Sequence, residues 1–296
     1  MARGYGGNKV NKRIVVAVVL AVFWAASAYA QATDFLELVK TGTPQSVEDA
    51  INNGASIKAQ DVMGRTPLLV AALDNPNPEV ITTLLKAGAD INALDGEGNN
   101  CLVYAARNNL EVITTLLKAG ADIETRDPYY DANALMWAAS DNPDPRAVTT
   151  LLKAGSDVNS RNKDDITALM WAAMKNKNAE VIVTLLNAGA EVNAQDSGGR
   201  TALMWAAKSN SNPAVIATLL DAGSNIKALD STGHTPLMLA AEASPNPEVI
   251  IALLKAGVDT KAKDNAGKTA FDYAKSNYSL RVRGADAYRM LQEASQ

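Results

Sequence analysis

The chain has 296 residues, a formal net charge of −4 at pH 7, one cysteine and one histidine. The acidic balance argues against nucleic acid as a partner, because nucleic acid binding requires a surface rich in Lys and Arg. A single cysteine, Cys101, excludes an internal disulfide. A stable fold therefore has to come from packing alone, for which the chain is long enough.

Residues 1–30 have the features of a cleavable secretory signal peptide. Four bases and no acid precede the apolar run "IVVAVVLAVFWAA", and Ala28 and Ala30 are the small residues that a signal peptidase requires. We predict cleavage after Ala30 and a periplasmic or secreted protein without membrane contact, whose charge changes from −4 to −8 because the four bases are lost. An uncleaved anchor is the alternative, since the apolar run approaches the ~20 residues that span a bilayer.

The remaining sequence repeats itself with a period close to 34 residues. A period in this range indicates stacked supersecondary units, none of which can bury its apolar face alone. The end units are expected to be more polar, because one of their faces has no neighbour. We place an N-terminal capping unit at 31–60, six full repeats at 61–94, 95–126, 127–161, 162–195, 196–229 and 230–263, and a C-terminal capping repeat at 264–296.

Each unit is predicted to contain two helices, as the copy at 230–263 illustrates. "DSTG" is a turn, after which Thr235 caps a first helix that begins with Pro236. Asn246 caps a second helix. That helix ends at Gly257, because glycine enters the left-handed backbone conformation without steric cost.

The turn, the T-P-L-x-x-A-A helix and the second helix ending in L-L-K-A-G-A-D resemble the ankyrin repeat. The resemblance covers 61–263 and extends to both capping units. It implies an all-α ankyrin-repeat solenoid of helix-turn-helix units joined by β-hairpin-like turns, with about six full repeats plus two capping units. It also implies a non-catalytic, monomeric module, without cofactor or metal, that binds another protein through its turn tips and the concave groove formed by its first helices.

The chain departs from the family pattern where relatives usually have His after T-P-L. That position is apolar in most copies here, so we expect the polar cross-link of that histidine to be absent. Methionine, a soft and adaptable side chain, is expected to fill the space. The methionines concerned are Met136, Met170, Met204 and Met238.

One column of large side chains recurs in the middle of the first helices. On a helical wheel Trp205 lies about 200° from Leu203, away from the buried stripe formed with Ala206 and Ala207, and so on the groove side. Two interpretations stay open: the rings fill space between repeats, or they form an apolar strip that anchors a partner. The column consists of Val70, Tyr104, Trp137, Trp171, Trp205, Leu239 and Tyr273.

The irregular turn "DPYYDAN" lacks the usual glycine and carries two tyrosines at its tip. A turn tip is exposed by geometry, and large aromatic side chains there have no core to serve, which favours a contact role. With the aromatic members of the column, these tyrosines complete the predicted partner-binding set. That set is Tyr104, Tyr129, Tyr130, Trp137, Trp171 and Trp205.

Nothing in the sequence indicates catalysis. His234 is the only histidine and is expected to be solvated in a turn, so neither a nucleophilic triad nor a zinc site can be assembled. Five acids recur at one repeat position, which favours a solvated ladder over a calcium site: Asp90, Asp122, Asp157, Glu191 and Asp259. The open alternatives to a protein-binding module are a secreted effector that engages a host protein, an enzyme with an unrecognised carboxylate site, and a mechanical spacer.

Overall fold

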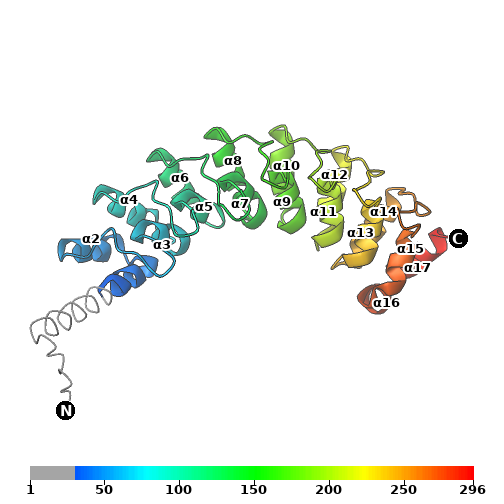
Figure 1. The fold of residues 1–296 in the computed structure, drawn as a ribbon, viewed down its shortest axis with the longest axis horizontal. Coiled ribbons are helices and arrows are strands. Elements are labelled where there is room, and N and C mark those ends of the chain that lie inside the picture. The colour runs from blue at the N-terminus through cyan, green and yellow to red at the C-terminus, as the bar shows by residue number, and fades with distance from the viewer. Residues whose placement is uncertain (1–30) are drawn as a thin grey trace, which may run out of the picture. The chain divides into compact units, whose positions relative to one another are not determined.

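The computed structural model describes residues 31–296, without the side chains of residues 282 and 283, so the predicted signal peptide lies outside it. Within these residues no helix is long and apolar enough to cross a membrane. The chain divides into two compact units, one ending at Asp90 and the other comprising Ile91–Gln296. Each unit consists of short helices that are joined by turns (Figure 1).

The first unit contains four described helices. Residues 31–41 are helical, and they are followed by α2 (Pro44–Asn52), α3 (Pro67–Asp74) and α4 (Pro78–Lys86). α2 packs against α4, and α3 packs against α4. The core of this unit is apolar and closed to solvent: Phe35, Val39, Val47, Leu68, Leu69, Val80, Ile81 and Leu84 are all at most 4% exposed.

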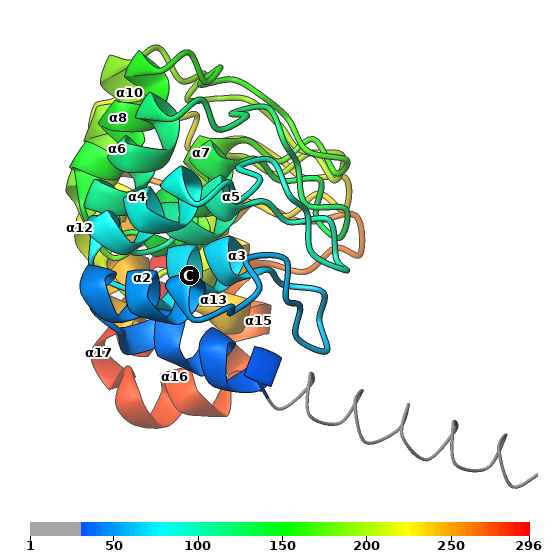
Figure 2. The same cartoon turned by 90° about the vertical axis from the view of Figure 1, so that its left-hand side faces the viewer.

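The second unit stacks helix pairs side by side. The first helices of successive pairs pack on one another in the order α5, α7, α9, α11, α13 and α15, and the second helices pack as α6, α8, α10, α12, α14 and α17. The turns that join the pairs project to one side of the helices (Figure 2). The bounds are α5 Cys101–Ala106, α6 Leu110–Lys118, α7 Ala134–Asp141, α8 Pro145–Lys153, α9 Ala168–Lys175, α10 Ala179–Asn187, α11 Ala202–Ser209, α12 Pro213–Asp221, α13 Pro236–Ala243, α14 Pro247–Lys255, α15 Ala270–Ser276, α16 Tyr278–Arg283 and α17 Ala285–Ala294.

The helix ends follow the predicted capping rules. The Thr235 hydroxyl accepts the N–H of Met238 at the start of α13, and the Asn246 side chain accepts the N–H of Glu248 at the start of α14. Gly257, just after α14, has a φ of +79°, as expected for a glycine that ends a helix. These local signals are confirmed, because a cap depends only on residues within one turn of the helix.

The first helices are buried on more sides than a single stripe. In α11 not only Leu203, Ala206 and Ala207 but also Ala202 and Met204 are at most 1% exposed, and Trp205 is the only half-buried apolar residue among them. The four methionines at the position of the family histidine are at most 1% exposed, as predicted. A first helix here has neighbours before it, after it and beside it, so the wheel of one helix underestimates its burial.

A ladder of buried asparagines links successive repeats where the family histidine is missing. The side-chain amide of Asn176, at the end of α9, donates to the carbonyls of Ala139 (2.9 Å) and Asn142 (2.8 Å). Asn210, one repeat later, donates in the same way to Ala173 (2.9 Å) and Asn176 (2.8 Å). These amides satisfy carbonyls at the ends of the first helices, so a polar cross-link between repeats exists, although it is made by another residue. The sequence analysis missed it.

Candidate partner-binding site

Each regular turn is organised by the acid with which it begins. Asp196 accepts the backbone N–H groups of Gly198 and Arg200 on Oδ1, both at 2.8 Å, and its own N–H donates to the carbonyl of Arg200 at 3.0 Å. Gly199 at the tip has a φ of +76°. The carboxylate thus replaces the strand pairing that would otherwise hold so tight a turn.

The second oxygen of this acid holds the aromatic ring of the following helix. Asp196 Oδ2 accepts the indole N–H of Trp205 at 3.0 Å, and Asp127 accepts that of Trp137 at 3.1 Å. The Tyr104 hydroxyl donates to Asp95 in the same arrangement. The spacing of nine or ten residues between the acid and the ring is visible in the sequence, but its meaning was missed, because the turn folds back over the helix only in three dimensions.

The repeat at 162–195 breaks this rule by one atom. Asn162 stands where the other turns have Asp, and its Oδ1 accepts the N–H groups of Asp164 (3.0 Å) and Ile166 (2.8 Å) as an aspartate would. Its Nδ2 is a donor and binds the carbonyl of Tyr130 at 3.0 Å. The indole N–H of Trp171 is therefore left buried without a hydrogen-bond acceptor.

Trp171 belongs to an aromatic cluster, which we define as Tyr129, Tyr130, Trp137 and Trp171. The ring of Tyr130 packs edge-on against Tyr129 (centroids 4.6 Å apart), Trp137 (5.7 Å) and Trp171 (5.6 Å), and the two indoles lie 5.5 Å apart. Trp137 and Trp171 are 6% and 4% exposed, whereas Tyr129 and Tyr130 are 74% and 40% exposed. The cluster has a buried base of two indoles and an exposed top of two phenols.

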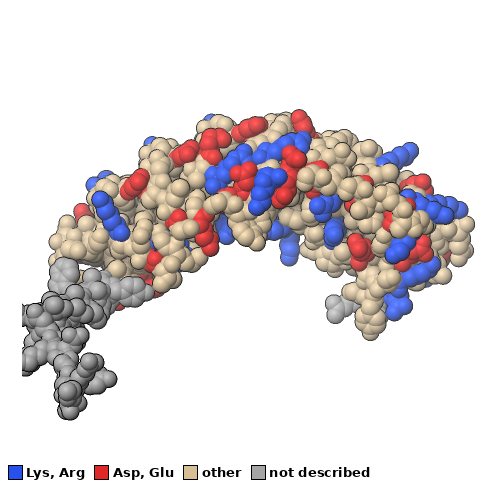
Figure 3. Space-filling model, viewed as in Figure 1, with Lys and Arg blue, Asp and Glu red and all other residues tan. Residues whose placement is uncertain are grey.

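Three cations surround the aromatic cluster. The guanidinium of Arg107 lies 3.8 Å from the centroid of Trp137, the ammonium of Lys175 lies 5.0 Å from that of Trp171, and the ammonium of Lys163 lies 5.7 Å from that of Tyr129. Arg107 is also ion-paired with Asp141 at 3.4 Å. Lys163 and Lys175 are exposed, and neither forms an ion pair with a carboxylate of residues 31–296. Figure 3 shows Lys and Arg gathered, among acidic side chains, over α7 to α10.

The two turns beside the aromatic cluster also carry unusual backbone. Asp131 has a φ of +55° and Asp165 a φ of +59°, at the positions where regular turns have a left-handed glycine. Aspartate tolerates this conformation better than most residues, but at a higher steric cost than glycine. Such positions are often associated with function.

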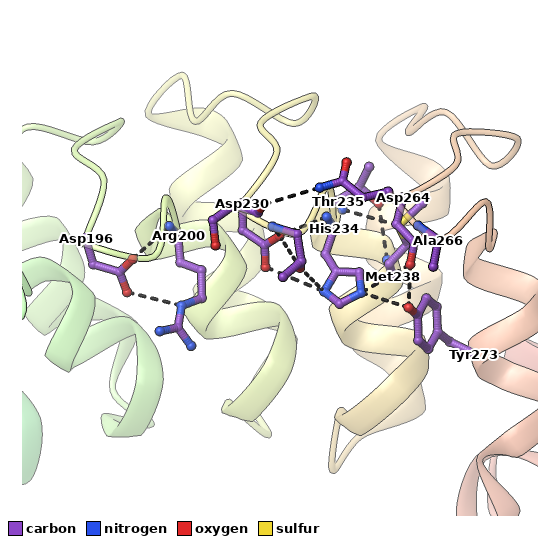
Figure 4. Close-up of polar contacts among 12 residues, drawn as sticks. Asp196, Arg200, Asp230, His234, Thr235, Met238, Asp264, Ala266 and Tyr273 are labelled. Carbon is purple, nitrogen blue, oxygen red and sulfur yellow. Dashed lines mark hydrogen bonds and ion pairs between the residues drawn. The ribbon is translucent and has the colours of Figure 1, made fainter.

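A second polar site links the turns of the last two repeats (Figure 4). His234 is only 18% exposed, which contradicts the prediction that it is solvated. Its Nε2 lies 2.8 Å from the hydroxyl of Tyr273 and 3.4 Å from a carboxylate oxygen of Asp264, and its Nδ1 lies 3.0 Å from the hydroxyl of Thr232 and 3.5 Å from Asp230. Tyr273 comes 39 residues later in the chain, so a local turn analysis could not place it over the imidazole.

The hydrogen bonds of this second site shift the pKa values of its acids. The hydroxyl of Tyr273, 2.5 Å from Asp264, lowers the pKa of that carboxyl below 3.8, and the same bond raises the pKa of Tyr273 to about 12. Burial raises the pKa of Asp230, but hydrogen bonds from the Thr232 side chain and from the N–H of His234 outweigh it, so the pKa falls below 3.8. The contacts therefore favour a carboxylate and a neutral phenol.

Neither site resembles a metal centre. Within residues 31–296 no three His, Cys, Asp or Glu side chains converge so as to hold an ion. The five recurring acids, from Asp90 to Asp259, are all exposed and spread over successive repeats. Their arrangement is that of a solvated ladder.

Comparisons with known families decide the identity of the fold. A model described as ankyrin repeats in three copies matches residues 35–127 and 135–230, and a second model of ankyrin repeats in many copies matches residues 219–274. Together they span well over half of the chain. The chain belongs to the ankyrin-repeat family. The comparison with curated proteins found no match.

The family assignment accounts for the fold and leaves one segment apart. An all-α array of paired helices, about seven pairs in all, is the ankyrin architecture. The interval between the two stretches matched by the first ankyrin model, 128–134, contains the tip of the irregular turn with Tyr129 and Tyr130. Ankyrin repeats are generally protein-binding modules and typically have no catalytic role. The segment that fits the family pattern least is thus the one with the most exposed aromatic surface.

The ankyrin framework brings together only part of the predicted partner-binding set. Tyr129, Tyr130, Trp137 and Trp171 meet in the aromatic cluster. Tyr104, 9% exposed, lies apart from the cluster, bonded to the turn of its own repeat, and Trp205 is half-buried under Arg200, whose guanidinium is 4.2 Å from the ring. The burial of Tyr104, Trp137 and Trp171 favours the packing interpretation for these three, and a binding role of the set stays a prediction.

Proposed function

We propose that this ankyrin-repeat array binds a protein partner through the turn side of the repeats around the aromatic cluster. The observation that carries this proposal is the pair of exposed tyrosines, Tyr129 at 74% and Tyr130 at 40% exposure, on a buried base of two indoles. Aromatic side chains with a fixed position are the commonest anchors of protein interfaces.

Rigidity supports the same proposal. Tyr130 is fixed through its backbone, because its N–H donates to Asp127 at 2.7 Å and its carbonyl accepts from Asn162 at 3.0 Å. The carbonyl of Tyr129 accepts from Lys163 of the next repeat. A preorganised surface loses little conformational entropy when a partner binds, so more of the contact energy appears as affinity.

Capture of partners from an extract of the source organism tests the proposal. The purified chain serves as bait beside the double variant Tyr129→Ala/Tyr130→Ala and a matched control, Tyr278→Ala, which removes another exposed tyrosine (71%) at the start of α16. We expect at least one protein to bind wild type and Tyr278→Ala but to be lost from the double variant. Equal recovery of every captured protein by a folded double variant would refute this function.

We further propose that the chain is exported, with residues 1–30 removed. The basic start, the apolar run and the Ala28-x-Ala30 site support this proposal. In a bacterium with two membranes such a signal delivers the protein to the periplasm. N-terminal sequencing of the protein isolated from its source is expected to begin at Gln31, and a chain that retains Met1 or Ala2 would contradict it.

A further inference from the structure

Trp171 differs from its equivalents in neighbouring repeats because nothing accepts its indole N–H. Its ring is 4% exposed and Nε1 is closed to solvent, yet no acceptor lies within hydrogen-bond distance. In the repeats before and after, Trp137 and Trp205 donate to aspartates at 3.1 and 3.0 Å. A buried donor without an acceptor is costly, so native proteins rarely keep one without a reason.

The turn of the same repeat cannot supply the missing acceptor. Asn162 uses Oδ1 for the backbone N–H groups of Asp164 and Ile166 and Nδ2 for the carbonyl of Tyr130. Exchanging the two ends of its amide would satisfy Trp171, but it would set an NH₂ group against two N–H donors and break the bond to Tyr130. The observed orientation is the better one, and it leaves an acceptor-shaped position beside the indole.

The surroundings of this position favour an anion from outside. The ammonium of Lys175 lies 5.0 Å from the centroid of Trp171 and 5.8 Å from that of Trp137, is exposed, and has no carboxylate partner among residues 31–296. A carboxylate here would gain both the indole N–H and a nearby cation, whereas a neutral acceptor would gain only the first. The chain already places a carboxylate at this point in the repeats that begin with Asp127 and Asp196.

Tyr130 controls access to Trp171. Its ring packs edge-on against Trp171 with centroids 5.6 Å apart, but the side chain is 40% exposed, so rotation of this one side chain opens the indole to solvent. The backbone contacts of Tyr130 to Asp127 and Asn162 do not depend on the ring. The opening is therefore a side-chain movement that leaves the turn in place.

We propose that the aromatic cluster recognises an acidic segment of the partner protein, and that one Asp or Glu carboxylate of that segment accepts the N–H of Trp171 beside Lys175. The partner carboxylate takes the place that Asp127 and Asp196 fill in the neighbouring repeats, while Tyr130 moves aside. This inference rests on the proposed function, because it specifies the chemistry of the partner at the same surface.

A peptide of ten glutamates serves as the probe, and a peptide of ten glutamines serves as its neutral counterpart. Binding is followed through the indole N–H signals of Trp171 and Trp205 in ¹H–¹⁵N spectra, assigned with Trp171→Phe and Trp205→Phe. We expect the glutamate peptide to shift the Trp171 signal and leave that of Trp205 unmoved, since Trp205 already has its acceptor in Asp196. The glutamine peptide should bind at least about tenfold more weakly.

Asn162→Asp is the decisive variant, because it supplies the acceptor from within and adds a like charge. It should weaken the glutamate peptide by about tenfold or more while the protein stays folded, and Lys175→Gln should weaken it as well. An unmoved Trp171 signal, equal affinity for both peptides, or wild-type affinity of Asn162→Asp would each overturn the inference. A partner lost by Tyr129→Ala/Tyr130→Ala but retained by Asn162→Asp and Lys175→Gln would also overturn it, and would leave the proposed function standing.

Discussion

Two neighbouring repeats with the same first-helix sequence place the same ring in different surroundings. "TALMWAA" occurs at 167–173 and again at 201–207. Trp205 donates to Asp196 and is half-buried under Arg200, whereas Trp171 has no acceptor and lies under Tyr130. The helix sequence therefore decides where the ring lies, and the turn before it decides what the ring can bind.

The interiors of these two repeats are alike. Leu169 and Leu203 are at most 1% exposed, as are Met170 and Met204, and both first helices end on an asparagine of the buried ladder. The differences are confined to the turn side, where the first repeat has Asn162 and a left-handed Asp165 and the second has Asp196 and a left-handed Gly199. Variation confined to one side of an otherwise uniform array indicates a surface shaped for recognition.

The largest expected effect tests whether the interiors are as alike as they look. Leu169→Ala and Leu203→Ala should each lower the free energy of unfolding by about 2–5 kcal/mol, because each removes a fully buried side chain and leaves a cavity. The two losses should agree within about 1 kcal/mol, measured by urea denaturation. A large difference between them would mean that the repeats differ in their core as well as in their turns.

The next effect reverses the comparison by one atom. Asp196→Asn should cost about 1–3 kcal/mol, because it leaves the N–H of Trp205 without an acceptor and removes the ion pair with Arg200 (3.2 Å). Asn162→Asp should instead stabilise the protein by about 1 kcal/mol, since it gives Trp171 the acceptor it lacks. Thermal unfolding of both variants measures the two signs. Destabilisation by Asn162→Asp would show that the bond to Tyr130 outweighs the one gained.

Much of the fold could be predicted because its signals are local. Thr235, Asn246 and Gly257 mark helix ends by the chemistry of a few adjacent residues, and the repeat period does the rest. The helical wheel placed Trp205 away from the buried stripe, and Trp205 is indeed half-buried. The wheel could not show that Trp171 is closed off, because its cover, Tyr130, belongs to the turn of the preceding repeat.

The candidate site was harder to predict because its contacts join residues about one repeat apart. Asn162 bonds to Tyr130, and Lys163 bonds to Tyr129, across 32 and 34 positions. No pattern within one repeat contains both partners of such a contact. The exchange of Asp for Asn at 162 is plain in the sequence, but its effect on Trp171 follows only from the geometry that Asp196 shows one repeat later.

The contact between turn acid and ring can be followed by titration in the last repeat, where the ring is a phenol. Tyr273 donates to Asp264, and its pKa is raised from 10.0 to about 12. Because the folded pKa is the higher one, the stability from this contact is complete below pH 10 and is lost as the pH rises towards 12. Asp264→Asn should return the pKa of Tyr273 towards 10.0, measured as tyrosinate absorbance with Tyr273→Phe as the blank.

The same contact predicts a loss of stability in acid. The pKa values of Asp264 and Asp230 lie below 3.8 in the folded protein, so the stability they contribute is present above pH 3.8 and is lost as the pH falls through the folded values. Asp264→Asn should make acid unfolding less steep. An unchanged acid transition in that variant would mean that other carboxylates control it.

A smaller effect concerns the backbone of the irregular turns. Asp165→Gly should stabilise the protein by up to about 1 kcal/mol, because glycine relieves the steric cost of a φ of +59° and matches Gly199 of the next repeat. Chemical denaturation of Asp165→Gly beside wild type measures it. A loss of stability would mean that the Asp165 side chain makes a contribution that outweighs the strain.

The smallest expected effect on stability is at the residue with the largest expected effect on binding. Tyr129→Ala should change the free energy of unfolding by less than about 0.5 kcal/mol, because the side chain is 74% exposed and touches mainly Tyr130 and Lys163. A purely structural ring would be missed in the folded state, as Leu203 would be, whereas a ring kept for recognition is missed only when a partner is present. Equal denaturation curves of wild type and Tyr129→Ala, together with weaker capture of the partner by the variant, would separate these two uses of an aromatic side chain.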